Sequence, residues 1–570
     1  MNGGPMEFVF TLHSHLPYVL NHGRWPHGSD WLCEAALDTY LPLLEALRRL
    51  GDEQTPAPVT IGFTPVLANQ LASPLFAREM DAFFEQRLAA CDAAPASLTT
   101  TGETYLLPQV AFWRERLSRL RTLFHQIDGD LIGAFRALEA SGRLEIIGSA
   151  ATHGFLPLLA RDESIRFQLA VGTAEHRRLF GHAPRGCWLP ECAYRPRGPW
   201  APWPGGPRSA MRRGIEEHLA DAGYRFFFVD AHLASAGRPL GLYGDPTAVD
   251  PEVHLPAARA GAARASGQRS PYHAYRVAHA RGADVSAFVR DPRASMQVWS
   301  RFEGYPGDGV YLEFHKMRWP GGLKLWRVTG AGVNLGAKEP YDAEVAFGRA
   351  RDHANHFAGL LAGIAAAEPA HRDGVVVAPF DTELFGHWWF EGPDFLADVY
   401  RALRAHPGVR PATGSQHLAR HPTRAAIRMP AGSWGANGDF SMWISDQTAW
   451  TWQRLWPLEE RFWDVAPAAL ASDDTRFILA QAARELLLAQ SSDWQFIIST
   501  GAAADYGERR FREHVSDTEE LVQALEERSP AALDRGHRRA AELAERDALF
   551  PDVLPALAAA LAGSRSLVVG

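Results

Sequence analysis

Two acidic residues of this chain follow short apolar stretches, a pattern typical of a carboxylate at the end of a buried strand. Glu191 stands in GCWLPECAYRP, after the strand-like segment Cys187–Leu189, and Asp381 ends the apolar run VVVAPFD. A carboxylate in such surroundings shifts its pKa or acquires a partner. Two of them predict glycosidic chemistry, in which one acts as nucleophile or base and the other protonates the leaving oxygen.

Each acid also has a simpler interpretation. Glu191 could form an ion pair with Arg195 or Arg197, which are close in the sequence, and Asp381 could be a buried ion-pair acid. Glu383 competes with Asp381 for a catalytic role, because residues two apart on a strand face the same side. Carboxyl groups about 5–5.5 Å apart would make the enzyme a retaining one.

Three histidines accompany these acids. His13 and His15 lie in HSHLPY, and His153 lies in SAATHGF. An HxH at the end of a first barrel strand is also a metal-ligand pattern, so a metal-dependent barrel hydrolase or deacetylase using these histidines and Asp381 is an alternative. In a glycosidase the imidazoles would bind sugar hydroxyls. No further His or Asp pair has obvious ligand spacing, and we expect no metal.

A tryptophan-rich window supplies possible sugar contacts. Seven of the 18 tryptophans fall between residues 434 and 494. Tryptophan is usually a core residue, but its flat ring also stacks on pyranose faces. Trp434, in SWGANGDFSMW, is either an exposed ring closing over a substrate or a domain-interface residue. Asp493 is either a polar contact from the helical region or a helix-end residue. Arg290 and the turn containing Gly307 could reach the opening of the same sugar cleft.

The elements that must position these residues alternate between strand and helix. The predicted strands are Glu7–His15, Val59–Pro65, Leu144–Ala150, Cys187–Leu189, Arg225–Asp230, Val285–Arg290 and Val375–Glu383. The predicted helices between them are Cys33–Leu50, Pro74–Ala90, Phe112–Ser141, Asp162–Phe180 and Ser209–Ala222. This alternation predicts an α/β fold with a parallel sheet, and the number of strands favours a closed barrel. Active sites of such barrels lie at the carboxyl ends of the strands, where the acids and histidines stand.

Two segments depart from the alternation. Residues 231–282 are rich in Gly, Ala, Pro and Arg, which predicts a long loop or insertion. After Pro411 we expect helices only, at Ser445–Val465, Asp473–Gln490, Gly507–Glu527 and Pro530–Phe550. The predicted domains are therefore a barrel over 1–410, including the insertion, and a helical domain over 411–570 that contributes to the cleft.

The bulk composition argues against several classes of protein, including nucleic-acid-binding and membrane-spanning ones. The 570 residues carry a formal net charge of −8, which gives no reason to expect a nucleic-acid partner. No apolar run approaches the roughly 20 residues that span a bilayer, and the first residues do not resemble a signal peptide. No GxGxxG follows a strand, so we expect no dinucleotide. The four cysteines lack CxxC spacing, which indicates a cytoplasmic protein.

Five stretches, in order, resemble glycoside hydrolase family 57, and most closely its branching-enzyme members: HSHLPY, GSAATHGFLPLL, CWLPECAYRP, APFDTELFGHWWFEGP and SWGANGDFSMW. The resemblance spans roughly residues 7–500. It implies an incomplete (β/α)7 barrel with an inserted loop or helical region and a C-terminal all-helical domain.

The resemblance also implies roles. It makes Glu191 the nucleophile and Asp381 the general acid/base, with no metal or cofactor. It implies substrate contacts by Arg290, Gly307, Trp434, Asp493, His13, His15, His153 and Trp388. The implied partners are donor and acceptor α-1,4-glucan chains, bound by a monomer or small homo-oligomer. In the implied reaction a glycosyl-enzyme forms on Glu191 and is transferred to a 6-hydroxyl, giving an α-1,6 branch.

The chain departs from the family's pattern in one place. A tyrosine-bearing loop over the cleft is expected between RFFFVD and VSAFVR, and Tyr243, Tyr272 and Tyr275 compete for that role. Because a cleft that admits water favours hydrolysis over transfer, a family-57 α-amylase or 4-α-glucanotransferase is an alternative function. A glucan-binding protein without catalysis is a further one.

Overall fold

The computed structural model describes residues 4–204, 210–234, 270–277, 285–300, 304–367, 374–423 and 426–565. Its centre is a curled parallel sheet in the strand order β10-β1-β2-β3-β4-β7-β9. These strands are β1 Met6–Ser14, β2 Val59–Phe63, β3 Leu144–Ser149, β4 Gly186–Trp188, β7 Phe226–Val229, β9 Ser286–Val289 and β10 Val375–Asp381. A single parallel bridge between Arg290 and Val377 joins the two ends of the sheet. The predicted incomplete (β/α)7 barrel is confirmed.

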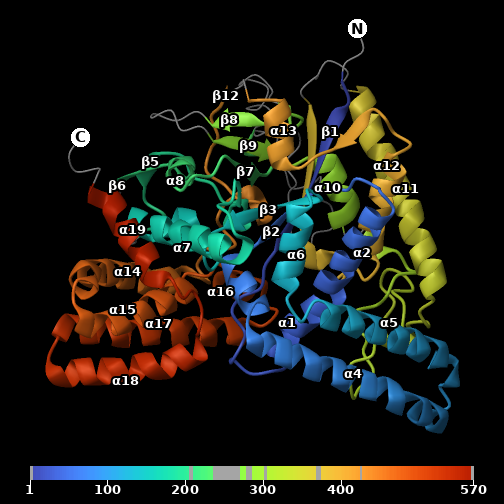
Figure 1. The fold of residues 1–570 in the computed structure, drawn as a ribbon, viewed down its shortest axis with the longest axis horizontal. Helices are drawn as coiled ribbons and strands as arrows, with labels where there is room; N and C mark the ends of the chain where they lie inside the picture. Colours follow the sequence, from blue (N-terminus) through green and yellow to red (C-terminus); the bar gives the residue numbers. More distant parts are fainter. Residues whose placement is uncertain are drawn as a thin grey trace.

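Helices cover the outside of this sheet (Figure 1). They are α1 Ser29–Ala35, α2 Leu41–Asp52, α3 Pro65–Leu71, α4 Pro74–Thr101, α5 Leu107–Gln126, α6 Leu131–Ala140, α7 Asp162–Phe180, α8 Ile215–Asp221, α10 Pro292–Trp299, α11 Ala343–Ala367, α12 Gly392–Leu403 and α13 Gly414–Arg420. Every residue of β1, β2, β7 and β9 is buried. Strands covered on both faces read as continuous apolar runs, which is why the sequence located them.

Two predicted helices are wrong in part. Phe112–Ser141 is not one helix, because Asp128 and Gly129 adopt positive φ angles after α5 and Asp130 caps α6 by accepting a hydrogen bond from Gly133. The start of the predicted helix 209–222 is a strand, β6 Ala210–Arg212, which pairs antiparallel with β5 Gly198–Trp200. The helix itself, α8, begins only after Gly214.

The segment after Pro411 is not purely helical, because β12 Ala426–Ile427 pairs with β8 Tyr275–Val277, which lies beside β9. β11 Val409–Pro411 pairs with β1. Uninterrupted helices begin later, with α14 Ala449–Leu470, α15 Asp473–Ala489, α16 Asp493–Thr500, α17 Ala504–Glu527, α18 Pro530–Arg546 and α19 Val553–Arg565. Most of the predicted insertion 231–282 lies outside the described residues. Among those residues no helix is long and apolar enough to cross a membrane.

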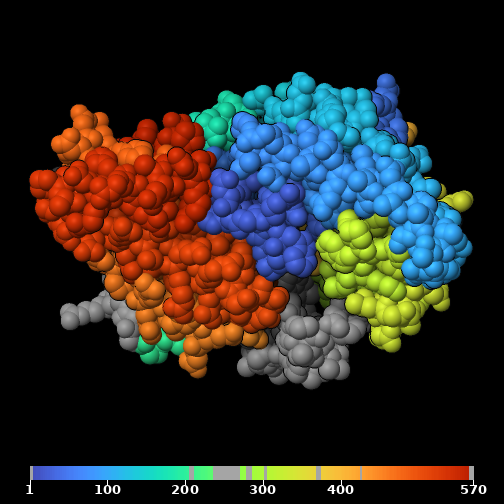
Figure 2. Space-filling model, turned by 90° about the horizontal axis from the view of Figure 1, so that it is seen from below, coloured from blue at the N-terminus to red at the C-terminus, as the bar shows by residue number. Residues whose placement is uncertain are grey.

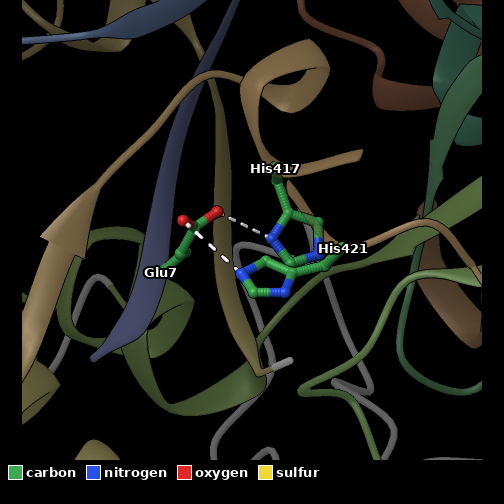
Figure 3. Close-up of side chains that lie close together, drawn as sticks. All are labelled: Glu7, His417 and His421. Atoms are coloured by element: carbon green, nitrogen blue, oxygen red, sulfur yellow. Dashed lines mark hydrogen bonds and ion pairs between the residues drawn. The ribbon is translucent and has the colours of Figure 1, made fainter. Parts of the chain in front are cut away.

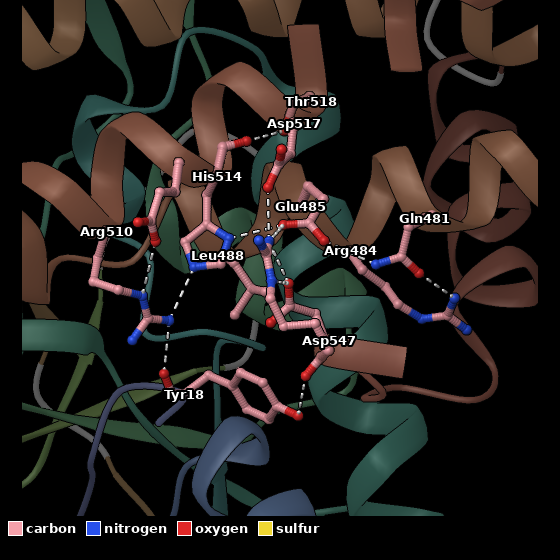
Figure 4. A network of polar contacts seen from close by, with 12 residues as sticks. Tyr18, Gln481, Arg484, Glu485, Leu488, Arg510, His514, Asp517, Thr518 and Asp547 are labelled. Carbon is pink, nitrogen blue, oxygen red and sulfur yellow. Dashed lines mark hydrogen bonds and ion pairs between the residues drawn. The ribbon is translucent and has the colours of Figure 1, made fainter. Parts of the chain in front are cut away.

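The helical region is fastened to the barrel through the loop that follows β1. Arg510 of α17 donates to the backbone oxygen of Tyr18 at 2.8 Å, and His514 Nδ1 lies 2.8 Å from Glu485 Oε2 of α15 (Figure 4). His22 Nε2 lies 2.6 Å from Asp547 Oδ1. In Figure 2 the helical region, orange to red, abuts the blue N-terminal segments, and the surface is hollowed beside their junction. The Arg510 and Asp547 contacts hold α17 and the residues around Asp547 against the loop that follows β1, and α16 packs against α17.

Candidate active site

The carboxyl ends of the barrel strands bring the predicted site residues to one edge. In the sheet register His13 of β1 lies beside Asp381 of β10 on one side and Gly62 of β2 on the other. Glu191 follows β4, and Arg290 follows β9. Parallel strands end at the same edge of a barrel, so segments almost 370 residues apart contribute to one site.

The backbone at Glu191 is held in an uncommon conformation. Glu191 and Cys192 have φ angles of 60° and 47° in the short 3-10 turn Pro190–Cys192. Non-glycine residues at positive φ are strained and cluster at functional sites. The backbone nitrogen of Trp434 donates to the Glu191 carbonyl oxygen at 3.0 Å and helps to hold this turn.

The Glu191 carboxylate receives hydrogen bonds only from neutral groups among the described residues. Trp434 Nε1 donates to Oε2 at 2.9 Å, and Ser492 Oγ donates to Oε1 at 3.2 Å. The side chain is 14% exposed. Burial raises its pKa to about 7 although the Trp434 hydrogen bond opposes the rise. The predicted ion pair with Arg195 or Arg197 is wrong, because Arg197 binds Glu217 and Arg195 contacts the Pro196 carbonyl.

Asp381 has no ion pair in the part of the chain that the structure describes, so that alternative is also wrong. Burial first, then the carboxylates of Glu383 and Glu191, raise the pKa of Asp381 well above its ordinary value. Glu383 accepts hydrogen bonds from the Tyr40 hydroxyl and, at 3.1 Å, from the His15 backbone. Asp381 accepts no hydrogen bond from the described residues, whereas two donors favour the anion of Glu191. These unequal surroundings suit Asp381 as an acid and Glu191 as a nucleophile.

The three histidines stack on one another behind Glu191. The ring centroids of His13 and His153 lie 4.9 Å apart, and those of His15 and His153 lie 4.0 Å apart. His13 Nε2 is 3.0 Å from His153 Nε2, and His15 Nε2 is 2.9 Å from Asp493 Oδ2. Burial lowers the pKa of His13 and of His153 well below the ordinary value, so both are neutral.

Trp434 differs from the expectation of an exposed ring. Its side chain is 5% exposed, and its indole lies against Trp188 in the barrel with ring centroids 5.0 Å apart. Arg290 is also buried, donates to Asp230 at 3.1 Å and lies 5.8 Å from the Trp434 ring centroid. Both residues support the floor of the site, since the ring orients an N–H toward the carboxylate of Glu191.

The other residues that were predicted to contact the substrate differ in their exposure to solvent. Asp493 opens α16 and pairs with His15. Trp388 is 48% exposed in the loop after β10, and Gly307 is exposed in the 3-10 turn Tyr305–Gly307. Of the tyrosines proposed to cover the cleft, Tyr272 and Tyr275 are buried at 7% and 4% exposure, and Tyr243 lies outside the described residues.

Among the described residues, three sets of histidine and carboxylate side chains lie close enough to share an ion. One, His15, His153 and Asp493, belongs to the site, where these groups hydrogen-bond to each other or to neighbouring side chains. The second, Glu7 with His417 and His421 (Figure 3), also receives Arg410 and Arg420. The third, Glu485, His514 and Asp547, receives Arg546. Guanidinium groups already neutralise the carboxylates of the second and third sets.

Sequence inspection missed Ser492, Tyr40 and Thr64. Ser492 donates to Glu191, Tyr40 donates to Glu383, and Thr64 Oγ1 lies 2.9 Å from His15 Nδ1. Thr64 could have been found, because it follows the β2 strand as the other site residues follow theirs. Ser492 and Tyr40 stand in helical segments, where no local pattern points to the barrel.

Two models of known protein families match this chain. A model described as "Glycosyl hydrolase family 57" matches residues 9–430, and one described as "1,4-alpha-glucan branching enzyme, C-terminal" matches residues 455–556. A 1,4-alpha-glucan branching enzyme of Thermococcus kodakarensis is 39% identical over 521 residues, which cover 91% of this chain and 73% of that protein.

Solved structures give the same result over nearly the whole chain. The crystal structure of a family 57 branching enzyme from Thermococcus kodakaraensis, in complex with glucose, has a TM-score of 0.86 at 38% identity and covers 98% of this chain and 96% of that one. The α-amylase AmyC from Thermotoga maritima has a TM-score of 0.78 at 27% identity, covering 98% and 99%. On these matches and on its barrel, the chain belongs to glycoside hydrolase family 57.

Proposed function

We propose that this protein is a 1,4-α-glucan branching enzyme that cleaves an α-1,4 bond and transfers the released chain to a 6-hydroxyl group. The observation that carries the proposal is the pair of buried acids with raised pKa values, Glu191 and Asp381, of which Glu191 alone accepts hydrogen bonds from the described residues. The match of residues 455–556 to the C-terminal region of branching enzymes favours transfer over hydrolysis.

The reaction is a double displacement. A Glu191 oxygen attacks the anomeric carbon while Asp381 gives its proton to the departing glycosidic oxygen, so one C–O bond forms as another breaks. The 6-hydroxyl of an acceptor glucose then attacks the glycosyl-enzyme and gives its proton to the Asp381 carboxylate. The second attack frees the Glu191 carboxylate, and two inversions retain the α configuration.

The other predicted contacts follow from this proposal. His13, His15 and His153 form the floor on which a sugar ring lies, and Asp493 reaches the same floor from α16. Exposed Trp388 offers a flat ring at the rim. The buried Arg290 and Trp434 support the sugar-binding floor from below. Gly307, in its exposed turn, lies at the opening of the cleft.

The proposal extends to the substrates, the product, the location and the oligomeric state of the protein. The donors and acceptors are α-1,4-glucan chains, the product is a glycogen-like polymer, and the protein acts in the cytoplasm as a monomer or small homo-oligomer. The second candidate function is α-amylase activity, which the likeness to the Thermotoga maritima α-amylase favours. Both activities share the glycosyl-enzyme and differ in whether water or a sugar hydroxyl attacks it.

The test follows amylose treated with the wild type. Loss of iodine absorbance, new α-1,6 signals in proton NMR and few new reducing ends are expected of a branching enzyme. Reducing ends without α-1,6 signals would identify an amylase instead. An unchanged glucan would refute the proposal and favour the alternative of a metal-dependent hydrolase that uses the histidines.

The pH dependence tests the assignment of the two acids. Because the pKa of Glu191 is raised to about 7, kcat/KM should fall as the pH drops through 7, where the nucleophile becomes protonated. The fall at alkaline pH reports Asp381, the proton donor, whose pKa burial raises well above its ordinary value. An acidic limb near pH 4.5 would contradict this picture of Glu191.

A further inference from the structure

We propose that His13, His153 and Ser492 form a one-directional chain of hydrogen bonds that ends on Glu191 and keeps its carboxylate oriented for attack. The inference rests on the proposed function in so far as Glu191 is the nucleophile. Ser492 and the two histidines act through Glu191, so they are positioning residues of the reaction.

The chain consists of three consecutive contacts from three elements. His13 Nε2 of β1 lies 3.0 Å from His153 Nε2. His153 Nδ1, in the loop after β3, lies 2.9 Å from Ser492 Oγ. Ser492 Oγ, immediately before α16, lies 3.2 Å from Glu191 Oε1. The histidines are 2% and 3% exposed, so water does not replace these partners freely.

The direction of the chain follows from its two ends. At one end a carboxylate oxygen can only accept, so the Ser492 hydroxyl points its hydrogen at Glu191 and must itself accept from His153 Nδ1–H. A neutral His153 then has a bare Nε2, which accepts from His13 Nε2–H. At the other end His13 Nδ1 is buried without a hydrogen-bond partner among the described residues.

The reverse direction leaves two groups unsatisfied. If His153 Nε2–H donated to His13, the proton of His13 would sit on buried Nδ1 with no acceptor, and Ser492 would turn its hydrogen to His153. Glu191 would then lose one of its two donors. A buried N–H without an acceptor costs more than an unpaired lone pair in a hydrogen-bond network of this kind. The forward direction is the stable one.

Burial, and not the charge of Asp493, keeps the histidines of this hydrogen-bond chain neutral. Asp493 faces His153 and is paired with His15, and Asp381 faces Glu191 from β10. Burial makes both histidines of the chain neutral, as the directional argument requires. Since the second donor to Glu191, the Trp434 indole, is also neutral, no cation neutralises the nucleophile by direct contact. Its orientation depends on these two hydrogen bonds.

Backbone contacts fix Ser492 in register with His153. The Ser492 backbone nitrogen donates to the His153 carbonyl oxygen at 3.1 Å, and Ser491 forms an antiparallel bridge with Gly154. His153 has a positive φ of 59°, which turns its ring toward Ser492 and away from the direction of the strand. The helical region therefore contributes a structural part of the catalytic site.

The first test observes the protons directly and does not depend on activity. In protein labelled with 15N-histidine, long-range 1H–15N NMR at pH 7.5 should show His13 protonated at Nε2 and His153 protonated at Nδ1. His13→Gln and His153→Gln variants assign the signals. A proton on Nε2 of His153, or on both nitrogens of either ring, would overturn the chain.

The second test measures the pH profile of α-1,4 bond cleavage, counted as branches plus reducing ends. Ser492→Ala should lower kcat/KM about tenfold and move the acidic limb up by about one pH unit, because Glu191 loses a donor that favours its anion. Ser492→Thr keeps the hydroxyl and should keep the limb near the wild-type pH. Ser14→Ala is the matched control, since Ser14 bonds Thr382 beside the chain at 2.7 Å.

Two variants of His13, at the end of the hydrogen-bond chain that is farthest from Glu191, give the sharpest comparison. His13→Leu removes the donor to His153 and should move the acidic limb in the same direction by a smaller amount, whereas His13→Gln retains an N–H donor and should restore most of it. An acidic limb that stays in place in Ser492→Ala, with the protein folded by circular dichroism, would overturn the proposal. Reducing ends without branches would refute the branching function and leave the hydrogen-bond chain untouched. If the wild type were inactive on glucan, the NMR test would still decide whether the hydrogen-bond chain has the proposed direction.

Discussion

The two ends of the barrel treat a buried carboxylate in opposite ways. Glu7, at the start of β1, is fully buried and lies beside His417 and His421 (Figure 3). It accepts hydrogen bonds from His417 at 2.9 Å, Arg420 at 2.6 Å and Arg410 at 3.0 Å. Burial alone would raise the pKa of Glu7, but these partners lower it to about 2. Glu191, at the other end, has neutral donors and a pKa of about 7.

The difference shows that burial alone does not make a carboxylate reactive. Both side chains lose most of their water, which disfavours the charged form. At Glu7 two guanidinium groups offset that loss, so the anion is stable and chemically inert. At Glu191 an indole and a hydroxyl orient the carboxylate without neutralising it. On the proposed function, the carboxylate of Glu191 therefore remains available for an attack on an anomeric carbon.

The largest effect is expected when Glu191 is replaced. Glu191→Gln should lower cleavage of amylose at least about a thousandfold, because an amide does not form the glycosyl-enzyme. The same variant should be more stable than wild type at pH 8 by about 1–2 kcal/mol, since the raised pKa means that ionisation above pH 4.5 favours the unfolded chain. Thermal unfolding at pH 5 and pH 8 measures this, and a variant less stable at pH 8 would contradict the comparison.

Removing only the indole donor should have the next largest effect. Trp434→Phe retains an aromatic ring against Trp188 but deletes the N–H at 2.9 Å from Glu191. A hydrogen bond to a charged group contributes about 1.5–3 kcal/mol, so kcat should fall about 10- to 100-fold. Steady-state kinetics on amylose provides the measurement. An unchanged kcat with a raised KM would show that Trp434 contacts the sugar and not the nucleophile.

At the opposite end of the barrel, a substitution should change stability and leave catalysis intact. Glu7→Gln leaves Arg410 and Arg420 without their carboxylate and should cost about 2–3 kcal/mol, less than in a closed site because these arginines are 44% and 36% exposed. Urea unfolding at pH 7 measures the loss, and the folded fraction should keep its specific activity.

The pH dependence of that loss sharpens the test. The pKa of Glu7 is lowered in the folded protein, so its contribution is present above about pH 4.5, the unfolded value, and is lost as the pH falls toward 2. Wild type and Glu7→Gln should therefore converge in stability at acid pH. A constant difference between pH 7 and pH 3 would contradict the ionic explanation.

The smallest effect is expected for Arg410→Ala. Arg410 is the more exposed of the two arginines, and Arg420 and His417 still bind Glu7 in its absence. A partly exposed ion pair contributes about 0.5–1 kcal/mol. Urea unfolding of this variant beside Glu7→Gln separates one partner from the whole cluster, and a loss equal to that of Glu7→Gln would show that Arg410 alone holds the carboxylate.

The sequence predicted the strands and both acids because each of them carries a local signal. The strand before Asp381 is a continuous apolar run, and Glu191 interrupts a similar one. Patterns of this kind report burial on both faces of a sheet. The same signal misplaced the start of the helix at 209–222, where β6 pairs with β5 in a small separate sheet whose three-residue strands leave no periodicity to detect.

What surrounds the acids could not be predicted from local patterns. Trp434 is 243 residues from Glu191, and Ser492 is 301 residues from it. Those contacts exist only after the helical region docks on the barrel, so nothing near either residue indicates its partner. Trp434, which the sequence leaves as either an exposed ring or a domain-interface residue, is buried against Trp188. The roles of the acids came from the resemblance to the family, and the hydrogen-bond partners of Glu191 came from the structure.

The order of these residues along the chain has a consequence for protein synthesis. Both acids leave the ribosome before Ser492 and the helix that carries it. A truncated or unfinished polypeptide therefore contains the two carboxylates but lacks the docked helix that orients one of them. On the proposal above, a polypeptide that ends before Ser492 would cleave glucan more slowly, because Glu191 would lack one of its two hydrogen-bond donors.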